Sequence, residues 1–272
     1  MQLLEEILKN APLFLLVFGR IFAFLMSLPL FSARNVPSQA KIALALYFSY
    51  FIFTQVDFSH FLPYLTEDGV FSMQYLLLLI GEFLIGIING FYVTIIFAAF
   101  STAGQFVAFQ MGFSASEVYD SLSQVENPLM GQYFNLVAML VFLQGQWMQR
   151  LFFGGLIKSF DSFNCASVLT EIYRKNLSGF LLSALTDLFM DALIISLPVM
   201  GALLLVSVSI GLLSKAAPQM NLLSEGFPIM MLLSFFVITT LLPDLCDFFG
   251  RSFYVGFVKL EQLYSYLAGS SL

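Results

Sequence analysis

The sequence predicts an all-α, membrane-associated protein of about six hydrophobic helices, and three observations support this class. Of the 272 residues, 59% are hydrophobic and only 10% are charged, whereas a soluble domain has about 25% charged residues. The chain contains 33 phenylalanines, and its mean hydropathy is +0.89. Its apolar residues gather in segments of membrane-helix length that polar connectors separate. We therefore expect the chain to lie in a membrane, or in a large assembly that covers most of its surface.

Composition also excludes several function classes. The net charge of −6 and the lack of a basic run argue against a nucleic-acid partner, which would need clustered lysines and arginines. His60 is the sole histidine, and Cys165 and Cys246 lack CxxC spacing, so neither a histidine-based metal site nor a Ser-His-Asp triad is expected. We predict no catalytic residue, no metal, no cofactor and no enzymatic activity. The acidic start MQLLEEILKN is not expected to be a signal peptide.

The first two segments differ in length. Residues 11 to 32 form an apolar run, interrupted by Arg20, that would extend roughly 33 Å as a helix and could span a bilayer core. Residues 42 to 56, bounded by Asp57 and Pro63, form a second helix that is short for a span. We expect this second helix to be a half-span or to be buried in protein.

The third segment, residues 72 to 103, has the features of a helix-packing core. Its one charged residue is Glu82, and Gly86 and Gly90 lie one helical turn apart on one face. Small residues at this spacing let two helix backbones approach closely.

A fourth and a fifth segment follow. Residues 131 to 157 contain Trp147 and then Arg150, a combination typical of a membrane interface. A polar connector leads to residues 178 to 214, which are too long for one straight span and contain Pro198. Because proline removes a helix hydrogen bond, we expect a kink or a break just before it.

The sixth segment, residues 227 to 243, is short and is expected to close at Pro243. The stretch from Asp244 to Leu267 then alternates aromatic and charged side chains. We predict that this stretch is a separate amphipathic helix that lies at a membrane interface or docks on partner proteins.

Simple counting of these helices contradicts the positive-inside rule. If Arg34 and Lys41 mark the cytoplasmic side, the connector bearing Lys158, Arg174 and Lys175 falls outside. Either one helix is miscounted, or some helices are broken or displaced from ordinary spanning positions.

The stretch from residue 104 to 131 is the candidate functional site. It turns from apolar to polar and acidic between two hydrophobic segments, and loops of this length are uncommon unless they are functional or disordered. Its apolar content is too high for a disordered spacer, so we expect an ordered loop that fills a space in the protein or its assembly. The candidate functional residues of this loop, to which the family resemblance described below gives a plug and gating role, are Gln110, Met111, Gly112, Phe113, Val118, Tyr119 and Leu122.

Several polar residues are candidates for assembly. Placing the charged side chains of Arg20 and Glu82 in hydrocarbon costs free energy, so both are expected to face protein. They either form ion pairs, with each other or with neighbouring subunits, or act in gating or ion passage. Gln105 is expected to be a buried polar residue. Lys215 and Pro218 are expected to shape a bend and to cap helix carbonyls.

Four blocks, in this order, carry a resemblance to a known family. They are PLFLLVFGRIFAFLMSLPLFSARNVPSQAKIALAL, GEFLIGIINGF, AGQFVAFQMGFSAS and SIGLLSKAAPQMNLLSEGFPIMMLL. The sequence resembles the FliR family of flagellar type III export-gate proteins, whose injectisome relatives are called SpaR or SctT. The AGQ…QMG block resembles the flagellar branch more closely.

The resemblance implies an assembly. Family members join FliP and FliQ in a helical cone that begins the export channel, next to FlhB-like and FlhA-like components, in the bacterial inner membrane at the flagellar basal body. Residues 1 to 175 would be similar to FliP, and residues 176 to 272 to a FliQ hairpin with an amphipathic tail. The loop after the third helix would be the plug of the export channel. Membrane lipid would surround the assembly, and unfolded flagellar proteins would pass through its channel.

Two departures and several alternatives accompany this resemblance. Relatives usually carry Asp-Pro where this chain has Asp120-Ser121, and many carry Gly-Gly-His where it has Gly145, Gln146 and Trp147. These changes concern the turn geometry of the plug and the end of the fourth helix.

An injectisome gate subunit remains an alternative function. A secondary transporter would need internal repeats and an intramembrane enzyme a nucleophile-base pair or a metal cluster; we find neither.

Overall fold

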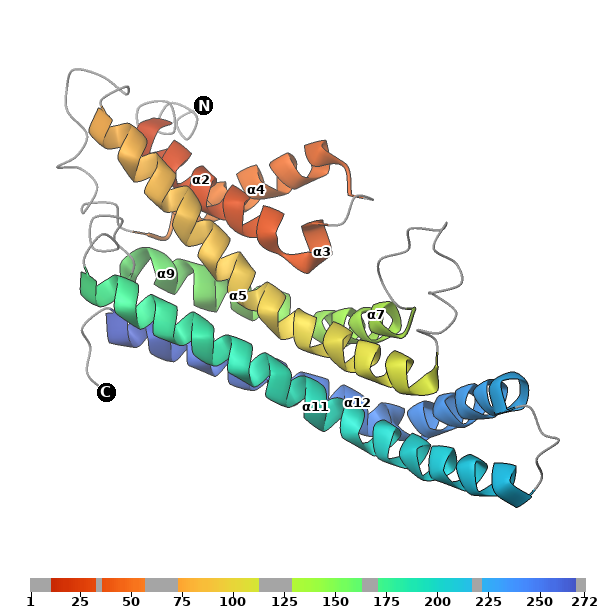
Figure 1. Cartoon of the computed structure of the whole chain (residues 1–272). Coiled ribbons are helices and arrows are strands. Elements are labelled where there is room, and N and C mark those ends of the chain that lie inside the picture. Colours follow the sequence, from red (N-terminus) through yellow and green to blue (C-terminus); the bar gives the residue numbers. More distant parts are fainter. Residues whose placement is uncertain are drawn as a thin grey trace. The chain divides into compact units, whose positions relative to one another are not determined.

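The structure is a computed structural model that describes residues 11–32, 36–56, 73–112, 129–162, 171–216 and 222–267 (Figure 1). Every regular element within these ranges is helical, as the sequence predicts. The chain forms two compact units. The first unit comprises Met1–Ile95, Met148–Ser183 and Gly256–Leu272, and the second comprises Ile96–Trp147 and Ala184–Val255.

The N-terminal apolar run forms two helices where one was expected. Helix α2 (Ala11–Ser27) ends two residues before Pro29, and Pro29 opens the short α3 (Pro29–Ser32). Proline lacks the N–H that would continue α2 but suits the first position of a new helix. Helix α4 (Ser38–Phe53) begins four residues before the predicted second segment, directly after Pro37.

Helix α5 (Met73–Met111) is longer than the predicted third segment and includes the start of the predicted loop. It ends at Gly112, whose φ of 84° is left-handed. Glycine adopts this conformation without the steric penalty of a side chain, which is why it commonly terminates helices. Gln105, Gln110 and Met111 are therefore helical residues.

The predicted fourth helix is interrupted. Helix α7 (Leu129–Gln144) is followed by a turn, the short α8 (Trp147–Gln149), the π-helical segment η2 (Arg150–Leu156) and α9 (Ile157–Ser162). In the turn, Gln146 has a φ of 55°, which is unfavourable for a side chain with a β-carbon. The interruption lies where the sequence departs from the Gly-Gly-His pattern.

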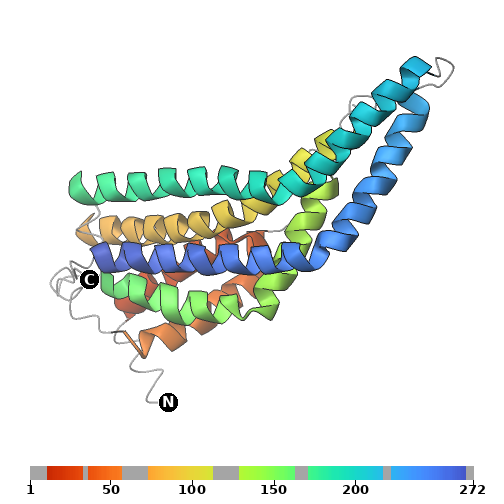
Figure 2. The same cartoon turned by 90° about the horizontal axis from the view of Figure 1, so that it is seen from below.

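Two long antiparallel helices complete the chain. Helix α11 (Glu171–Ala216) contains Pro198, and α12 (Leu222–Leu267) contains Pro228 and Pro243. Figure 2 shows both helices changing direction partway along their length. The predicted disruption at Pro198 is therefore compatible with one continuous helix, because long helices bend at proline.

The predicted end of the sixth helix at Pro243 is wrong, because α12 continues to Leu267. Most aromatic residues of the expected interfacial segment are buried in the chain itself: Phe249, Phe253, Phe257 and Tyr264. In the second unit, the Phe253 ring lies 5.1 Å from that of Phe97 and 5.2 Å from that of Phe142. The buried aromatic side chains of this segment pack on α5 and α7 within the chain, whereas Tyr254 and Val255 stay exposed.

Three described helices are long and apolar enough to cross a membrane, one within each of α5, α11 and α12. In its most apolar stretch, α5 has 61% of its residues buried within the chain, whereas the stretches in α11 and α12 have 22% and 17%. Helix α5 is thus a core element, and α11 and α12 present mostly uncovered apolar surface.

Candidate functional site

The first unit contains a buried ion pair between α2 and α5. The side chains of Arg20 and Glu82 are both 0% exposed. Arg20 Nε donates to Glu82 Oε2 at 2.5 Å, and Arg20 Nη2 donates to Glu82 Oε1 at 2.9 Å. This is the bidentate geometry in which arginine binds a carboxylate most strongly. The structure thus joins two charges whose pairing the sequence left open.

Helix α9 supplies the rest of this environment. Arg20 Nη1 donates to Ser159 Oγ at 3.2 Å, and the Ser159 hydroxyl donates to the Leu156 carbonyl at 2.8 Å. The guanidinium carbon of Arg20 lies 4.0 Å from the centre of the Phe160 ring, within range of a cation–π interaction. Sequence reasoning missed Ser159 and Phe160, because nothing in the local pattern links α9 to a charge in α2.

The glycines of α5 form a close contact with α2 in the first unit. A β-carbon on Gly86 would lie 2.2 Å from the Arg20 carbonyl oxygen, and one on Gly90 would lie 2.5 Å from the Ser27 β-carbon. The Thr94 hydroxyl lies 2.7 Å from the Ser27 carbonyl oxygen. The helix that approaches Gly86 and Gly90 therefore belongs to the same chain, and the contact positions Arg20 beside Glu82.

The two ends of the predicted plug loop meet in the second unit. A β-carbon on Gly104 would lie 2.4 Å from the Met130 carbonyl oxygen, and one on Gly131 would lie 3.0 Å from the Ser101 carbonyl oxygen. Helices α5 and α7 thus cross with their backbones nearly in contact. Met111, at the end of α5, is 0% exposed, as expected of a core residue.

The other predicted site residues have varied positions. Gln105 is exposed, whereas Gln110 and Gly112 are partly buried. Lys215 lies exposed in the last turn of α11, where a positive charge interacts favourably with the helix dipole. Phe113, Val118, Tyr119, Leu122 and Pro218 lie outside the described residues.

Trp147, for which the sequence predicts a membrane-interface position, packs inside the second unit. It is 8% exposed and lies 6.5 Å from Phe253 between ring centres. A β-carbon on Gly145 would lie 2.2 Å from its indole nitrogen. The turn between α7 and α8 thus directs the indole into the aromatic core of the second unit.

Comparison with known proteins assigns the family. The pattern of the family described as bacterial export proteins, family 1, matches residues 11–255. The chain belongs to this family. It is 31% identical over 212 residues to the flagellar biosynthetic protein FliR of Bacillus subtilis (strain 168), covering 78% of this chain and 79% of the relative. The FliR protein of Pectobacterium carotovorum subsp. carotovorum is 26% identical over 256 residues, which cover 93% of each chain.

Family membership decides the function at a coarse level. The chain is a FliR-family component of the flagellar type III export apparatus and is not an enzyme. Its long apolar helices fit a membrane-embedded component. Within the part of the chain that the structure describes, no group of three or more metal-ligating side chains is present.

Proposed function

We propose that this chain is a subunit of the flagellar export gate, in which FliP-like and FliQ-like partners join it to form the entrance of the channel for unfolded flagellar proteins. The gate would lie in the bacterial inner membrane at the basal body, next to FlhB-like and FlhA-like components. The observation that carries this proposal is the family match over residues 11–255. We further propose, from the family resemblance, that residues 1 to 175 resemble the FliP-like partner and residues 176 to 272 the FliQ-like partner.

The uncovered surface of α11 and α12 supports a need for partners. Leu205 of α11 is 68% exposed and Leu232 of α12 is 72% exposed. Contiguous apolar surface of this kind marks an interface with protein or membrane. Lipid alone is a poor fit for its length: the 39-residue apolar helix within α11 would extend about 58 Å, and fitting it into a ~30 Å core needs a tilt of about 60°. Transmembrane helices tilt by about 0–40°, so part of this surface should contact protein.

Co-expression tests the assembly. The full chain would be expressed alone and with FliP-like and FliQ-like proteins from the same source, and intact complexes would be weighed by native mass spectrometry. The proposal expects one stable complex that contains all three proteins. A monodisperse chain that binds neither partner would contradict it.

We also propose that the loop between α5 and α7 plugs the channel at rest. The close crossing at Gly104 and Gly131 supports this role, because it fixes the two helices that precede and follow the loop. Met111 and Met130 are buried at the base, so the seal itself falls to the predicted residues Phe113, Val118, Tyr119 and Leu122.

A shortened loop tests the plug. From Gly104 to Met111, α5 extends about 10 Å beyond the crossing, so a return path of about four residues is sufficient. Replacing residues 114 to 126 with four glycine and serine residues should therefore leave the complex assembled while raising ion conductance and dye uptake. A tight, fully assembled variant would place the seal in partner subunits.

A further inference from the structure

The close crossing of α5 and α7 in the second unit carries exposed carboxamide side chains. Gln105 follows the crossing residue Gly104 on α5, Gln132 follows Gly131 on α7, and both glutamines are exposed. A β-carbon on Gly131 would lie 3.5 Å from Gln105 Cγ, so the Gln105 side chain runs beside the residue that precedes Gln132. Gln105, expected from the sequence to be a buried polar residue, thus lies at the surface.

Two more polar side chains border the same place. Ser101 lies one turn before Gln105 on α5, and a β-carbon on Gly131 would lie 3.3 Å from its hydroxyl oxygen. Asn135 lies one turn after Gly131, on the same face of α7. It is partly exposed, and its Oδ1 has no hydrogen-bond partner among the described residues. We refer to Ser101, Gln105, Gln132 and Asn135 as the polar patch.

The polar patch lies in a part of the chain that is apolar and uncharged. No charged residue occurs between Glu82 and Glu117, or between Glu126 and Arg150. Lipid is a poor neighbour for the patch, because an amide group in hydrocarbon loses its hydrogen bonds to water without gaining others. A ligand that both donates and accepts hydrogen bonds fits it better, because a carboxamide does both.

We propose that the polar patch binds the extended backbone of an unfolded polypeptide. Each residue of such a chain, except proline, has one backbone N–H and one C=O. Gln105 and Gln132 would accept from a backbone N–H and donate to a backbone C=O. A partner helix is a poorer fit, because its backbone groups are already bonded along the helix. The inference rests on the proposed function, since an export gate supplies the unfolded chain.

The lack of charge makes this binding independent of the sequence that passes. Every polypeptide presents the same backbone groups, whereas a charged patch would retain segments of the opposite charge. The crossing also holds the patch in place, since a β-carbon on Gly104 would lie 2.4 Å from the Met130 carbonyl oxygen. Side chains on a rigid base lose less freedom when they bind a ligand.

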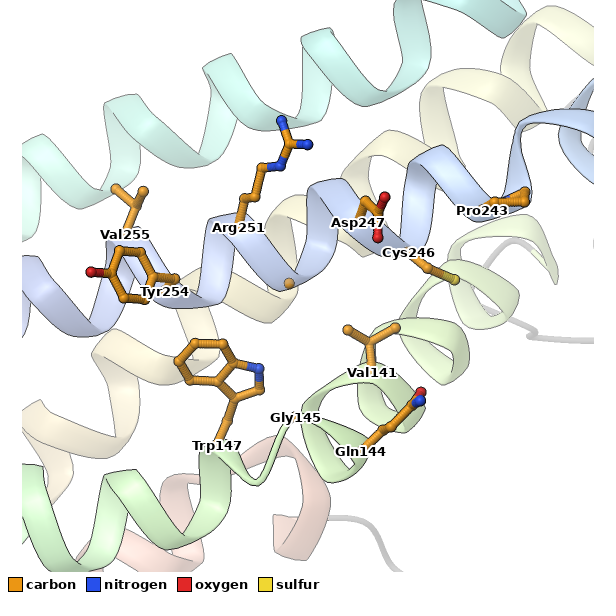
Figure 3. Close-up of a pocket in the computed structure, with 11 residues that line it drawn as sticks. Val141, Gln144, Gly145, Trp147, Pro243, Cys246, Asp247, Arg251, Tyr254 and Val255 are labelled. Carbon is orange, nitrogen blue, oxygen red and sulfur yellow. The ribbon is translucent and has the colours of Figure 1, made fainter.

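Gln144 provides a matched control. It is exposed on the same helix as Gln132, but it lies about 18 Å away along the helix axis. Figure 3 shows Gln144 at the side of an open groove whose other wall is α12. The proposal assigns no contact with the polypeptide to this glutamine.

Cysteine crosslinking in the assembled complex tests the proposal. In a background of Cys165→Ser and Cys246→Ser, cysteine replaces Gln105, Gln132 or Gln144 in turn. Stalled substrates carry an acidic, a basic or an uncharged segment in the channel, with one cysteine at each position of that segment in turn. We expect disulfides from positions 105 and 132 with similar yields for all segments, and none from position 144.

A second change separates recognition from mere proximity. Gln132→Leu should lower the disulfide yield from position 105 about two- to tenfold, because the chain loses a hydrogen bond. Gln132→Asn keeps the carboxamide and should retain most of the yield. Surface changes of this kind rarely disturb folding, and native mass spectrometry verifies that each variant assembles.

The outcomes distinguish this inference from the proposed function. A substrate that crosslinks to Tyr119 in the loop, but to neither position 105 nor position 132, would overturn the polar patch and leave the proposed function intact. A substrate that reaches none of these positions would contradict both. Equal yields from positions 105 and 144, or yields that follow the charge of the segment, would also overturn the proposal.

Discussion

Arg20 uses all three guanidinium nitrogens inside the first unit, two on Glu82 and one on Ser159. Removing two charges from water costs several kcal/mol for each ion, and close attraction offsets this cost only when the geometry is good and the remaining donors are satisfied. The bidentate contact with Glu82 meets the first condition, and the Nη1 bond to Ser159 contributes to the second. The pair is nevertheless sensitive, because the loss of either partner leaves the other charged and buried.

Substitution of one partner should therefore destabilise the chain more than substitution of both. We expect Arg20→Met or Glu82→Leu alone to cost about 3–5 kcal/mol, and the double variant to recover most of that loss. The measurement is the denaturant midpoint of the full chain in detergent, followed by circular dichroism. Lys158→Met is the control, since Lys158 and Glu261 are 55% and 49% exposed and an exposed pair contributes less than about 1 kcal/mol. Equal losses in the single and double variants would refute this account.

Substitution of Gln146, a single residue in the turn between α7 and α8, should stabilise the chain. Its φ of 55° favours glycine, which has no β-carbon to collide with the backbone. Gln146→Gly should raise stability by about 0.5–1 kcal/mol in the same denaturation experiment. Gln149→Gly is the control: Gln149 has a helical φ of −64°, so glycine there should lower stability by a similar amount.

Part of this residue-level detail can be predicted from the sequence. Arg20 and Glu82 stand alone in apolar segments, and the cost of lipid exposure predicts that both face protein. Their pairing with each other, and the contribution of Ser159, could not be predicted, because Ser159 is 139 positions from Arg20 and only the tertiary fold brings α9 to α2.

At the scale of elements, α5 positions both candidate sites. Its first half carries Glu82 and the glycines that admit α2, and its second half carries Gly104 at the crossing with α7. The sequence predicts the close glycine contact, because Gly86 and Gly90 share one face. It does not predict how far α5 extends, since local pattern cannot distinguish the last turns of an apolar helix from an apolar loop.

Helix α12 shows the same limit. The sequence predicts that a helix ends at Pro243, yet α12 continues through it. The segment beyond it buries Phe249 and Phe253 against α5 and α7, and that tertiary packing outweighs the one hydrogen bond that proline removes. An amphipathic pattern therefore showed that one face is covered but did not identify what covers it.

The glycine contact predicts a contrast between two alanine variants. Gly86→Ala places a β-carbon 2.2 Å from the Arg20 carbonyl oxygen and should cost about 1–3 kcal/mol through overpacking. Gly201→Ala on α11 meets no atom within 4 Å and should stabilise the isolated chain by about 0.5–1 kcal/mol, because alanine favours a helix. Denaturant midpoints of both variants check this contrast, and a tolerant Gly86 would mean that α2 and α5 are less closely packed.

At the scale of the whole molecule, the chain leaves much of its apolar surface uncovered. The long helices α11 and α12 bury few of their apolar residues within the chain, and the chain belongs to a family of export proteins. Composition alone predicts this need for a membrane or an assembly. The identity of the partners comes from the family resemblance, because a generic leucine-rich face does not specify its partner.

We propose that this chain borders the path of the exported protein, and site-specific photo-crosslinking can test that position. A photoreactive residue would replace Tyr119 in the loop, or Leu205 on α11 as the control, since Leu205 is 68% exposed and should face partners or lipid. Each variant would be expressed in flagellated cells with an export substrate that stalls in the channel. We expect position 119 to crosslink to the stalled substrate and position 205 not to crosslink to it. Crosslinking from position 205 but not from position 119 would contradict it.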